Sequence, residues 1–362
     1  MPAKGEVLST TQEEEWDIAV VGGGIVGLAI AYRAGRRGLR AVVLERDRAG
    51  AGASGQAAGM LAPVSEAEVG HAELLEDGLE AARAWPGFAR VLGGELHAAG
   101  TLIVARDRDE AEALDRERAH RERLGLRVER LLPSAARRLE PALAPSVRLA
   151  LHVPDDRAVD PRAVVAALRE RVEVREGTEV VALRDGDAAG HDDDRDGDAG
   201  APAVVLANGE VLRAGTVVLA AGAWSADLLD VPVRPVKGQI LRLRDPAGPG
   251  LVERTIRFPG GYLVPRGDGR YALGATVEER GFDTTVTAGG LYELLRDAGE
   301  VVPGISELVV EEAAAALRPG TPGNVPIVER RGRTIVATGH FRNGVLLAPV
   351  TADRVVGALA LA

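Results

Sequence analysis

The sequence predicts an α/β protein of two domains, one doubly wound domain that binds a dinucleotide and a second domain built mainly on antiparallel strands. Three observations support this fold class. Residues 16–47 read as strand, glycine turn, helix and strand, in that order. Apolar strands at 216–224 and 334–338 fit the same parallel sheet, whereas residues 233–310 contain short strands of alternating polarity. Because the first pattern returns after the second, both domains are expected to be discontinuous in sequence.

The N-terminal unit carries the pattern Gly22-x-Gly24-x-x-Gly27 between its first strand and its helix. In this arrangement Gly22 permits a tight turn, Gly24 lets a pyrophosphate approach the backbone, and Gly27 lets helix and strand pack closely. The phosphates would lie at the free amides and positive dipole of the helix N-terminus. Glu45 ends the second strand, where it is expected to accept hydrogen bonds from a ribose 2′-hydroxyl and to repel a 2′-phosphate. The alternative is a plain glycine turn in a parallel sheet.

The composition indicates a globular chain. Its 362 residues suggest about two domains, and a hydrophobic content of 46% is ample for their cores. No stretch approaches the ~20 apolar residues of a membrane span, and the N-terminus lacks the apolar run of a signal peptide. We therefore expect a cytoplasmic protein without membrane contact. The lack of cysteine excludes disulfides, thiolate metal sites and cysteine nucleophiles.

The net charge of −10 argues against a surface that binds nucleic acid. Much of this charge lies in residues 185–198, where seven aspartates accompany one arginine. Such a run cannot be buried, so we expect an acidic loop over 185–200 between two strands. Residues 1–15 are expected to form a disordered tail. The aspartates lack the spacing of a calcium loop, and no metal site is predicted.

Residues 48–63 are dense in glycine and alanine, which leaves backbone amides open to a large flat ligand. We interpret them as a second ligand-contacting loop, because they follow the strand that carries Glu45 at the edge where doubly wound sheets bind ligands. A flexible linker is the alternative. The strand at 216–224 also ends in small residues, Ala221 and Gly222, which would let the chain pass close to the ligand.

Helical spacing dominates residues 66–138, with one helix over 72–85 and another over 109–124. Trp85 and Phe88 are expected to lie in the core, because their spacing matches a buried helix face. We assign 16–85, 145–232 and 319–362 to the dinucleotide domain, and 86–144 and 233–318 to the substrate domain.

The ligand is interpreted as FAD. A glycine pattern at the N-terminus, a second small-residue loop and late return strands suggest a ligand spread over several segments. No other glycine pattern follows a strand and opens a helix, so electrons are expected from the organic substrate and not from NADPH. The lack of cysteine rules out disulfide reductase chemistry and a cysteinyl link to the flavin, so the FAD is expected to be non-covalent.

Residues 17–63, 216–224, 262–276 and 318–350 resemble the D-amino-acid-oxidase class of FAD proteins, and within it the glycine oxidases of bacterial thiamine biosynthesis. The likeness spans nearly the whole chain outside the tail and the acidic loop. The strings that carry it are AAGMLAP (57–63), PVKGQ (235–239), YLVPR (262–266), GATVEERGFDT (274–284), LRPGTP (317–322) and GHFRNGVLLAP (339–349).

The resemblance implies three catalytic residues. Arg318 would grip the substrate carboxylate with its planar fork, and the Tyr262 hydroxyl would donate to the same group. Arg342 would be a second cation over the active site. The alternatives are a structural ion pair for Arg318, a core position for Tyr262 and a surface position for Arg342. His340 could act as a base or form a structural hydrogen bond, and Lys237 could have a role beside the flavin.

The amides of residues 343–346 and the helix that follows would stabilise the negative charge that reduction places on the flavin. The expected cofactor contacts are Gly22, Gly24, Ile25, Val26, Gly27, Glu45, Arg46, Ser54, Ala58, Gly59, Met60, Val180, Ala221, Gly222, Trp224, Arg342, Asn343, Gly344, Val345 and Leu346.

The implied reaction is oxidation of glycine to an imine and then a 2-oxo acid, with dioxygen reduced to hydrogen peroxide and the imine available for thiazole synthesis. Sarcosine or small D-amino acids remain alternative substrates, because Val277 stands where the family commonly has a bulkier thioether. The alternative activities are a secondary-amine or D-amino-acid dehydrogenase with another electron acceptor and, in a different class, a non-catalytic dinucleotide-binding or tRNA-associated protein. A homo-oligomer and transient contact with thiazole synthase are also expected.

Overall fold

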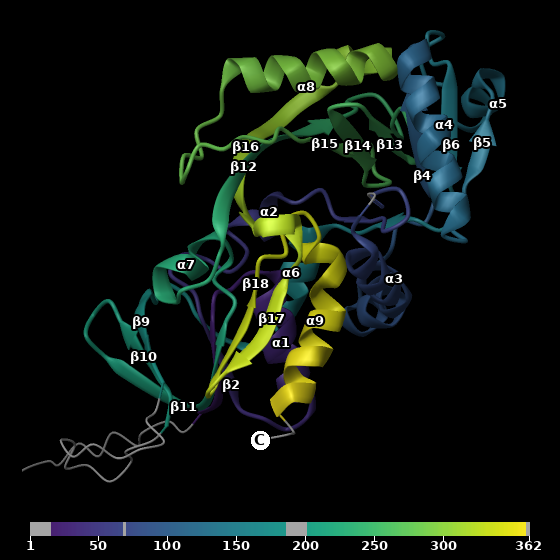
Figure 1. Ribbon diagram of the computed structural model, residues 1–362. Helices are drawn as coiled ribbons and strands as arrows, with labels where there is room; N and C mark the ends of the chain where they lie inside the picture. Colours follow the sequence, from purple (N-terminus) through teal and green to yellow (C-terminus); the bar gives the residue numbers. More distant parts are fainter. Residues whose placement is uncertain (1–15, 68–69, 186–200, 360–362) are drawn as a thin grey trace, which may run out of the picture.

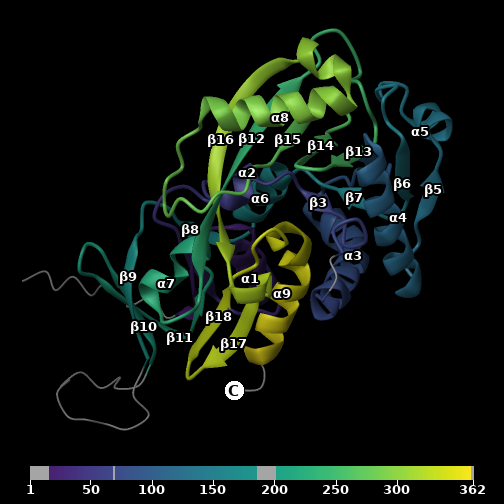
Figure 2. The same cartoon turned by 45° about the horizontal axis from the view of Figure 1, so that its top comes forward.

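The computed structural model describes residues 16–67, 70–185 and 201–359. It contains two eight-stranded sheets, one in each half of the molecule (Figures 1 and 2). The expected tail and all but the first residue of the expected acidic loop lie outside the described residues. Within those residues, no helix combines the length and the apolar character needed to cross a membrane.

The first sheet has the strand order β17-β18-β11-β1-β2-β8, and the hairpin of β9 and β10 extends from β11. All pairs from β18 to β8 are parallel, as the alternation of strand and helix predicts, and β17 joins the edge as an antiparallel strand. Its strands are β1 (Trp16–Val21), β2 (Ala41–Leu44), β8 (Glu173–Arg175), β9 (Val180–Arg184), β10 (Ala203–Leu206), β11 (Val211–Leu219), β17 (Ile327–Arg331) and β18 (Thr334–Thr338).

Helices α1 (Ile25–Arg36), α3 (Ala72–Leu92), α6 (Pro161–Arg169) and α9 (Gly344–Leu359) pack around one core on this sheet. The C-terminal helix α9, yellow in both views, lies between α1 and α3 (Figures 1 and 2). Trp85 and Phe88 are buried there, as predicted, with ring centroids 5.4 Å apart. Short segments complete this half, namely α2 (Ala53–Gln56), α7 (Ser225–Leu228), the 3-10 turn Gly222–Trp224, and the two-stranded ribbon of β3 (Met60–Leu61) and β7 (Arg157–Ala158).

The second sheet has the order β16-β12-β15-β14-β13-β4-β6-β5 and is antiparallel except where β13 pairs with β4. Helix α8 (Ala288–Val301) lies across the face of this sheet that is turned away from the first sheet (Figure 1). The strands are β4 (Thr101–Ala105), β5 (Glu129–Leu131), β6 (Leu149–Val153), β12 (Arg234–Arg244), β13 (Thr255–Phe258), β14 (Gly261–Pro265), β15 (Arg270–Gly274) and β16 (Val309–Gly320). The remaining elements here are α4 (Arg108–Arg123), α5 (Pro133–Leu139) and the 3-10 turns Pro303–Glu307 and Pro322–Asn324.

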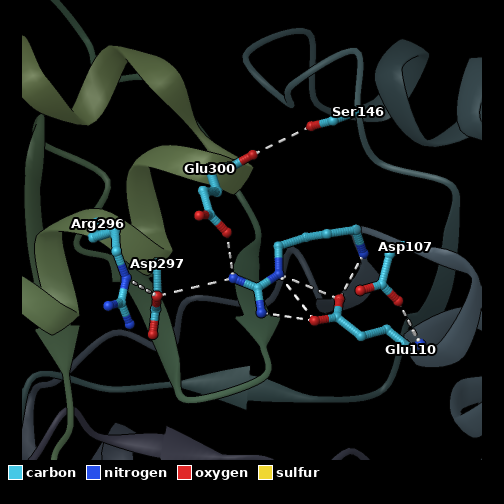
Figure 3. Close-up of polar contacts among 7 residues, drawn as sticks. Asp107, Glu110, Ser146, Arg296, Asp297 and Glu300 are labelled. Carbon is cyan, nitrogen blue, oxygen red and sulfur yellow. Dashed lines mark hydrogen bonds and ion pairs between the residues drawn. The ribbon is translucent and has the colours of Figure 1, made fainter.

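Arg106 connects the end of α8 to the junction between β4 and α4. Figure 3 shows Glu110, Asp297 and Glu300, the three acids around its guanidinium. Its guanidinium forms a 2.6 Å ion pair with Glu110 and a 2.7 Å ion pair with Glu300 of α8. Asp297 lies 4.0 Å from the same group. Since Arg106, Glu110 and Asp297 are partly buried and the acids share one cation, the network fixes α8 more firmly than an isolated surface pair would.

The structure differs from the sequence expectations at three places. Residues 101–105 form a central strand, so helical spacing does not extend through all of 66–138. Helix α3 continues through Pro86 to Leu92, because Phe88 and Leu92 are buried against the first core. Strand β6 pairs with β4 in the second sheet, although residues 145–153 were assigned to the dinucleotide domain. The two-domain division with its assigned boundaries remains a proposal.

Candidate active site

A cavity of about 1040 Å³ lies between the carboxyl ends of β1, β2 and β11 and the facing strands of the second sheet. Its volume is at the upper end of the usual range for ligand pockets, roughly 300–1,000 Å³. All of the predicted site residues line it except Gly27, Asn343 and Leu346. The topology therefore brings together segments that are up to about 300 residues apart in the chain, at the edge where parallel sheets bind ligands.

The glycine turn forms the wall at the start of α1. Gly22 has a φ of 110°, and a Cβ there would overlap the carbonyl of Ala220 on the neighbouring strand. Gly27 lies behind the cavity, where a Cβ would overlap the Gly22 carbonyl, so its predicted packing role is confirmed. The amide of Ile25 already donates to Ser54 Oγ at 2.9 Å. The small-residue loop thus contacts the helix N-terminus directly.

Glu45 lies at the end of β2 and lines the cavity. Its carboxylate accepts a 2.7 Å hydrogen bond from the amide of Gly23 and a 3.0 Å bond from the amide of Asp47. The guanidinium of Arg46 stacks 3.9 Å from the ring centroid of Trp224, which adds a flat surface at the cavity edge. This group of side chains and main-chain atoms suits a ribose and an aromatic base.

Arg318 projects from β16 toward the second-sheet side of the cavity. Its Nη1 donates to the carbonyls of Thr276 at 3.0 Å and Lys237 at 3.3 Å. A Cβ on Gly238 would overlap both terminal nitrogens of the guanidinium, so glycine at this position makes room for the side chain. Burial lowers the pKa of Arg318, whereas the neighbouring Tyr262 opposes this effect, and an arginine remains charged at neutral pH.

Within the residues that the structure describes, Arg318 has no carboxylate at ion-pair distance. A buried cation without an anion is costly, because it has lost its hydration without gaining a partner. The arrangement therefore suits an anionic ligand, and a carboxylate matches the planar guanidinium fork.

Tyr262 and Arg257 lie directly opposite each other on β14 and β13, so their side chains share one face of the sheet. Both line the cavity. Arg257 donates to the carbonyl of Ser65, and burial lowers the pKa of Arg257 while the charge of Glu66 opposes this effect. Sequence reasoning missed Arg257, because only the pairing of the two strands distinguishes it from the many other arginines of the chain.

The loop before α9 contributes Arg342 and His340 to the cavity lining. Arg342 forms a 3.1 Å ion pair with Glu66. His340 Nε2 lies 3.0 Å from Thr351 Oγ1 of α9, and burial lowers the pKa of His340 to about 4. The imidazole is therefore neutral at physiological pH, and the hydrogen bond expected as one of its two alternative roles is present.

Besides Gly27, two predicted site residues lie outside the cavity lining. Leu346 is buried, and its carbonyl accepts a 2.8 Å hydrogen bond from Trp85 Nε1. Asn343 directly precedes α9, and its amide donates to the His340 carbonyl at 2.8 Å. Lys237, for which a role beside the flavin was one possibility, is also absent from the lining. Its ammonium lies instead between Asp283 and Glu278.

The chain is similar in sequence to a known family and to several bacterial proteins. The model of the family described as FAD dependent oxidoreductase (DAO) matches residues 17–357. A glycine oxidase from Geobacillus kaustophilus is 33% identical, covering 93% of this chain and 90% of the relative. The thiamine biosynthesis oxidoreductase ThiO of Rhizobium etli is 35% identical, with coverage of 93% and 94%. The bifunctional protein ThiO/ThiG of Synechocystis is 34% identical, and this chain spans 50% of its length.

Among solved structures, the crystal structure of glycine oxidase from Geobacillus kaustophilus superposes with a TM-score of 0.86 at 31% identity. The match covers 96% of this chain and 95% of that one. The likeness extends over both sheets, and so over both walls of the cavity.

Proposed function

The chain belongs to the family of FAD-dependent oxidoreductases, and from this premise we propose that it oxidises glycine to the imine, with dioxygen as the electron acceptor. It is an enzyme with FAD as its cofactor. The cavity fits this group, since a glycine turn at a helix N-terminus suits a pyrophosphate and Glu45 suits a ribose. The predicted site residues keep their assigned roles as proposals.

The proposal rests chiefly on the partly buried guanidinium of Arg318. It lies on the cavity wall, donates hydrogen bonds to two main-chain carbonyls, and has Tyr262 beside it. An amino-acid carboxylate would supply the missing negative charge and would accept hydrogen bonds from both side chains. This pair would fix the substrate by its carboxylate end and leave its amine and Cα directed into the cavity.

The residues of the chain contribute mainly orientation to the reaction. When bound, FAD supplies the acceptor for the hydride that leaves the substrate Cα. Arg318 and Tyr262 would hold the carboxylate so that Cα reaches that acceptor in one geometry. Gly344 and Val345 line the cavity at the start of α9, where the positive end of the helix dipole favours negative charge. His340 stays neutral and engaged with Thr351, which argues against a dedicated base there.

We further propose that the product imine serves thiazole synthesis for thiamine. Relatives named for thiamine biosynthesis and for a bifunctional ThiO/ThiG protein support this role. An imine of this kind hydrolyses readily to the 2-oxo acid, so transient contact with thiazole synthase would shorten its exposure to water. A homo-oligomeric state and a cytoplasmic location remain predictions, as does the lack of nucleic-acid partners.

A second candidate is a dehydrogenase for sarcosine, proline or a small D-amino acid that passes its electrons to another acceptor. Val277 favours these larger substrates, because this cavity residue is small and 61% exposed, which suits a substituent on the amine. The purified holoenzyme under air distinguishes the two candidates. Glycine oxidase activity requires hydrogen peroxide equal in amount to the glycine consumed. If the flavin is reduced by an amine but dioxygen does not reoxidise it, the dehydrogenase is correct.

A further inference from the structure

Lys237 is a buried lysine whose ammonium does not face the cavity. It is 1% exposed, and the chain has one other lysine, Lys4. Its Nζ lies 3.0 Å from Asp283 Oδ2 and 3.6 Å from Glu278 Oε2. Both acids belong to the segment between β15 and α8, which also supplies cavity wall residues. One ammonium therefore holds two separate points of this segment.

Glu278 is the centre of a hydrogen-bond network. Its Oε1 accepts from the Thr276 hydroxyl at 2.6 Å and from Gln239 Nε2 at 2.7 Å. Although burial raises the pKa of Glu278, these two hydrogen bonds and the charge of Lys237 hold it below its usual value. The carboxylate is thus ionised at neutral pH, and the ammonium balances its charge.

The main chain repeats the same connection. The amide of Lys237 donates to the Glu278 carbonyl at 2.9 Å, and the amide of Glu278 donates to the Lys237 carbonyl at 3.0 Å. Side chains and backbone together therefore fix residues 276–278 against the start of β12.

This fixed segment is the one that orients Arg318. Nη1 of Arg318 donates to the carbonyl of Thr276 and to the carbonyl of Lys237. These two carbonyls belong to the two chain segments that the Lys237–Glu278 bridge joins. With Nη1 committed to two main-chain carbonyls, the orientation of the guanidinium plane is set. A shift of the Thr276 carbonyl would rotate that plane.

We propose that Lys237 is a positioning residue for carboxylate recognition, acting on Arg318 through Glu278 and Thr276. The inference rests on the proposed function, since it specifies how the carboxylate-binding arginine is held. Without the ammonium, Glu278 and Asp283 would place two negative charges close together in a half-buried site. Their repulsion would displace residues 276–278 and loosen the guanidinium.

The test uses the FAD-loaded enzyme and acetate as a carboxylate probe, with binding followed by the change in the flavin absorption spectrum. We expect Lys237→Met to raise the Kd for acetate and the KM for glycine on the order of 10-fold, with a smaller effect on kcat. Lys237→Arg should recover most of the affinity. Thr276→Val removes the hydroxyl that donates to Glu278 and accepts from the amide of Gln239, and it should raise the acetate Kd and the glycine KM as well.

Glu279→Gln is the matched control, because Glu279 lies in the same segment and forms an exposed 3.1 Å ion pair with Arg234. It should leave acetate binding unchanged. In a double-mutant cycle, Lys237→Met should add little to Arg318→Lys, since both changes act on one guanidinium.

An unchanged acetate Kd in both Lys237→Met and Thr276→Val would overturn the inference. If Lys237→Met fails to retain FAD, Lys237→Arg and Thr276→Val still decide the matter through the same Kd. Failure of the wild-type enzyme to bind acetate would instead refute the proposed carboxylate site, which distinguishes the two claims.

Discussion

The carboxylate of Glu45 accepts a hydrogen bond from the amide of Gly23, with 2.7 Å between oxygen and nitrogen. The acid that ends β2 is therefore connected to the glycine turn that follows β1. Glu45 serves two purposes in this account, since it supports the turn and faces the cavity where a ribose would lie.

Replacement of Glu45 by alanine should weaken FAD binding by roughly 10- to 100-fold, because hydrogen bonds to a charged group contribute about 1.5–3 kcal/mol. The measurement is the flavin content after gel filtration and the Kd for FAD of the stripped protein. Glu45→Gln keeps an acceptor for the Gly23 amide, so its Kd for FAD should lie between those of the wild type and Glu45→Ala. A Glu45→Ala protein that retains its full flavin content would refute the ribose assignment.

Replacement of Gly238 by alanine should impair substrate binding without loss of FAD. The new Cβ would overlap the guanidinium of Arg318, which must then move away from the cavity position it occupies. We expect kcat/KM for glycine to fall by at least about 10-fold, since a displacement of about 1 Å can cost far more than that. The check is steady-state kinetics at equal flavin content, with Gly289→Ala as the control, because a Cβ at Gly289 meets no atom within 4 Å.

Replacement of Arg318 by alanine should raise the KM for carboxylate-bearing substrates by roughly 100-fold or more, because two charge-assisted hydrogen bonds would be lost. Amines without a carboxylate should be affected much less. Parallel kinetics with glycine and a simple amine such as ethylamine give the comparison. Equal losses for both substrates would show that Arg318 does not recognise the carboxylate.

Asp156 predicts a dependence of stability on pH. Its side chain is 1% exposed, and burial raises its pKa from 3.8 to about 7. The folded protein therefore keeps this proton up to about pH 7, whereas the unfolded chain releases it near pH 4. The stability that protonated Asp156 contributes is fully present below pH 4 and is lost as the pH rises to about 7. Over this range the free energy of unfolding falls by up to about 1.4 kcal/mol per pH unit.

Asp156→Asn stays neutral, so its Tm relative to the wild type should increase between pH 4 and pH 7 and then level off. Asp155→Asn, at an exposed neighbour, is the control and should show no such trend. A Tm difference between Asp156→Asn and wild type that does not change with pH would mean that Asp156 is ionised in the folded protein.

Local sequence patterns predicted the parts of the fold that local physics determines. The strand, turn and helix of residues 16–36 depend on glycines and an apolar period that lie next to each other in the chain. The position of β6 depends on its pairing with β4. The five residues of β6 are mostly apolar, and their sequence alone does not indicate which of the two sheets the strand joins. Helix α3 passes Pro86 because burial of Phe88 and Leu92 offsets the local cost of proline.

The same distinction applies to the site. Arg318 and Tyr262 were found through motifs that surround them, whereas Arg257 has no motif and is identified by its register opposite Tyr262. Lys237 was noticed because lysine is rare in this chain, but its partners, Asp283 and Glu278, follow only from the folded segment.

We propose that this FAD-dependent enzyme takes its electrons from glycine. The most direct measurement is an anaerobic titration of the FAD-loaded protein with glycine, monitored by the absorbance of the oxidised flavin. We predict complete loss of that absorbance, with one glycine consumed for each flavin reduced. When air is admitted, the absorbance should recover and hydrogen peroxide should form. A flavin that stays oxidised at saturating glycine, yet is bleached by dithionite, would show that glycine is not the electron donor.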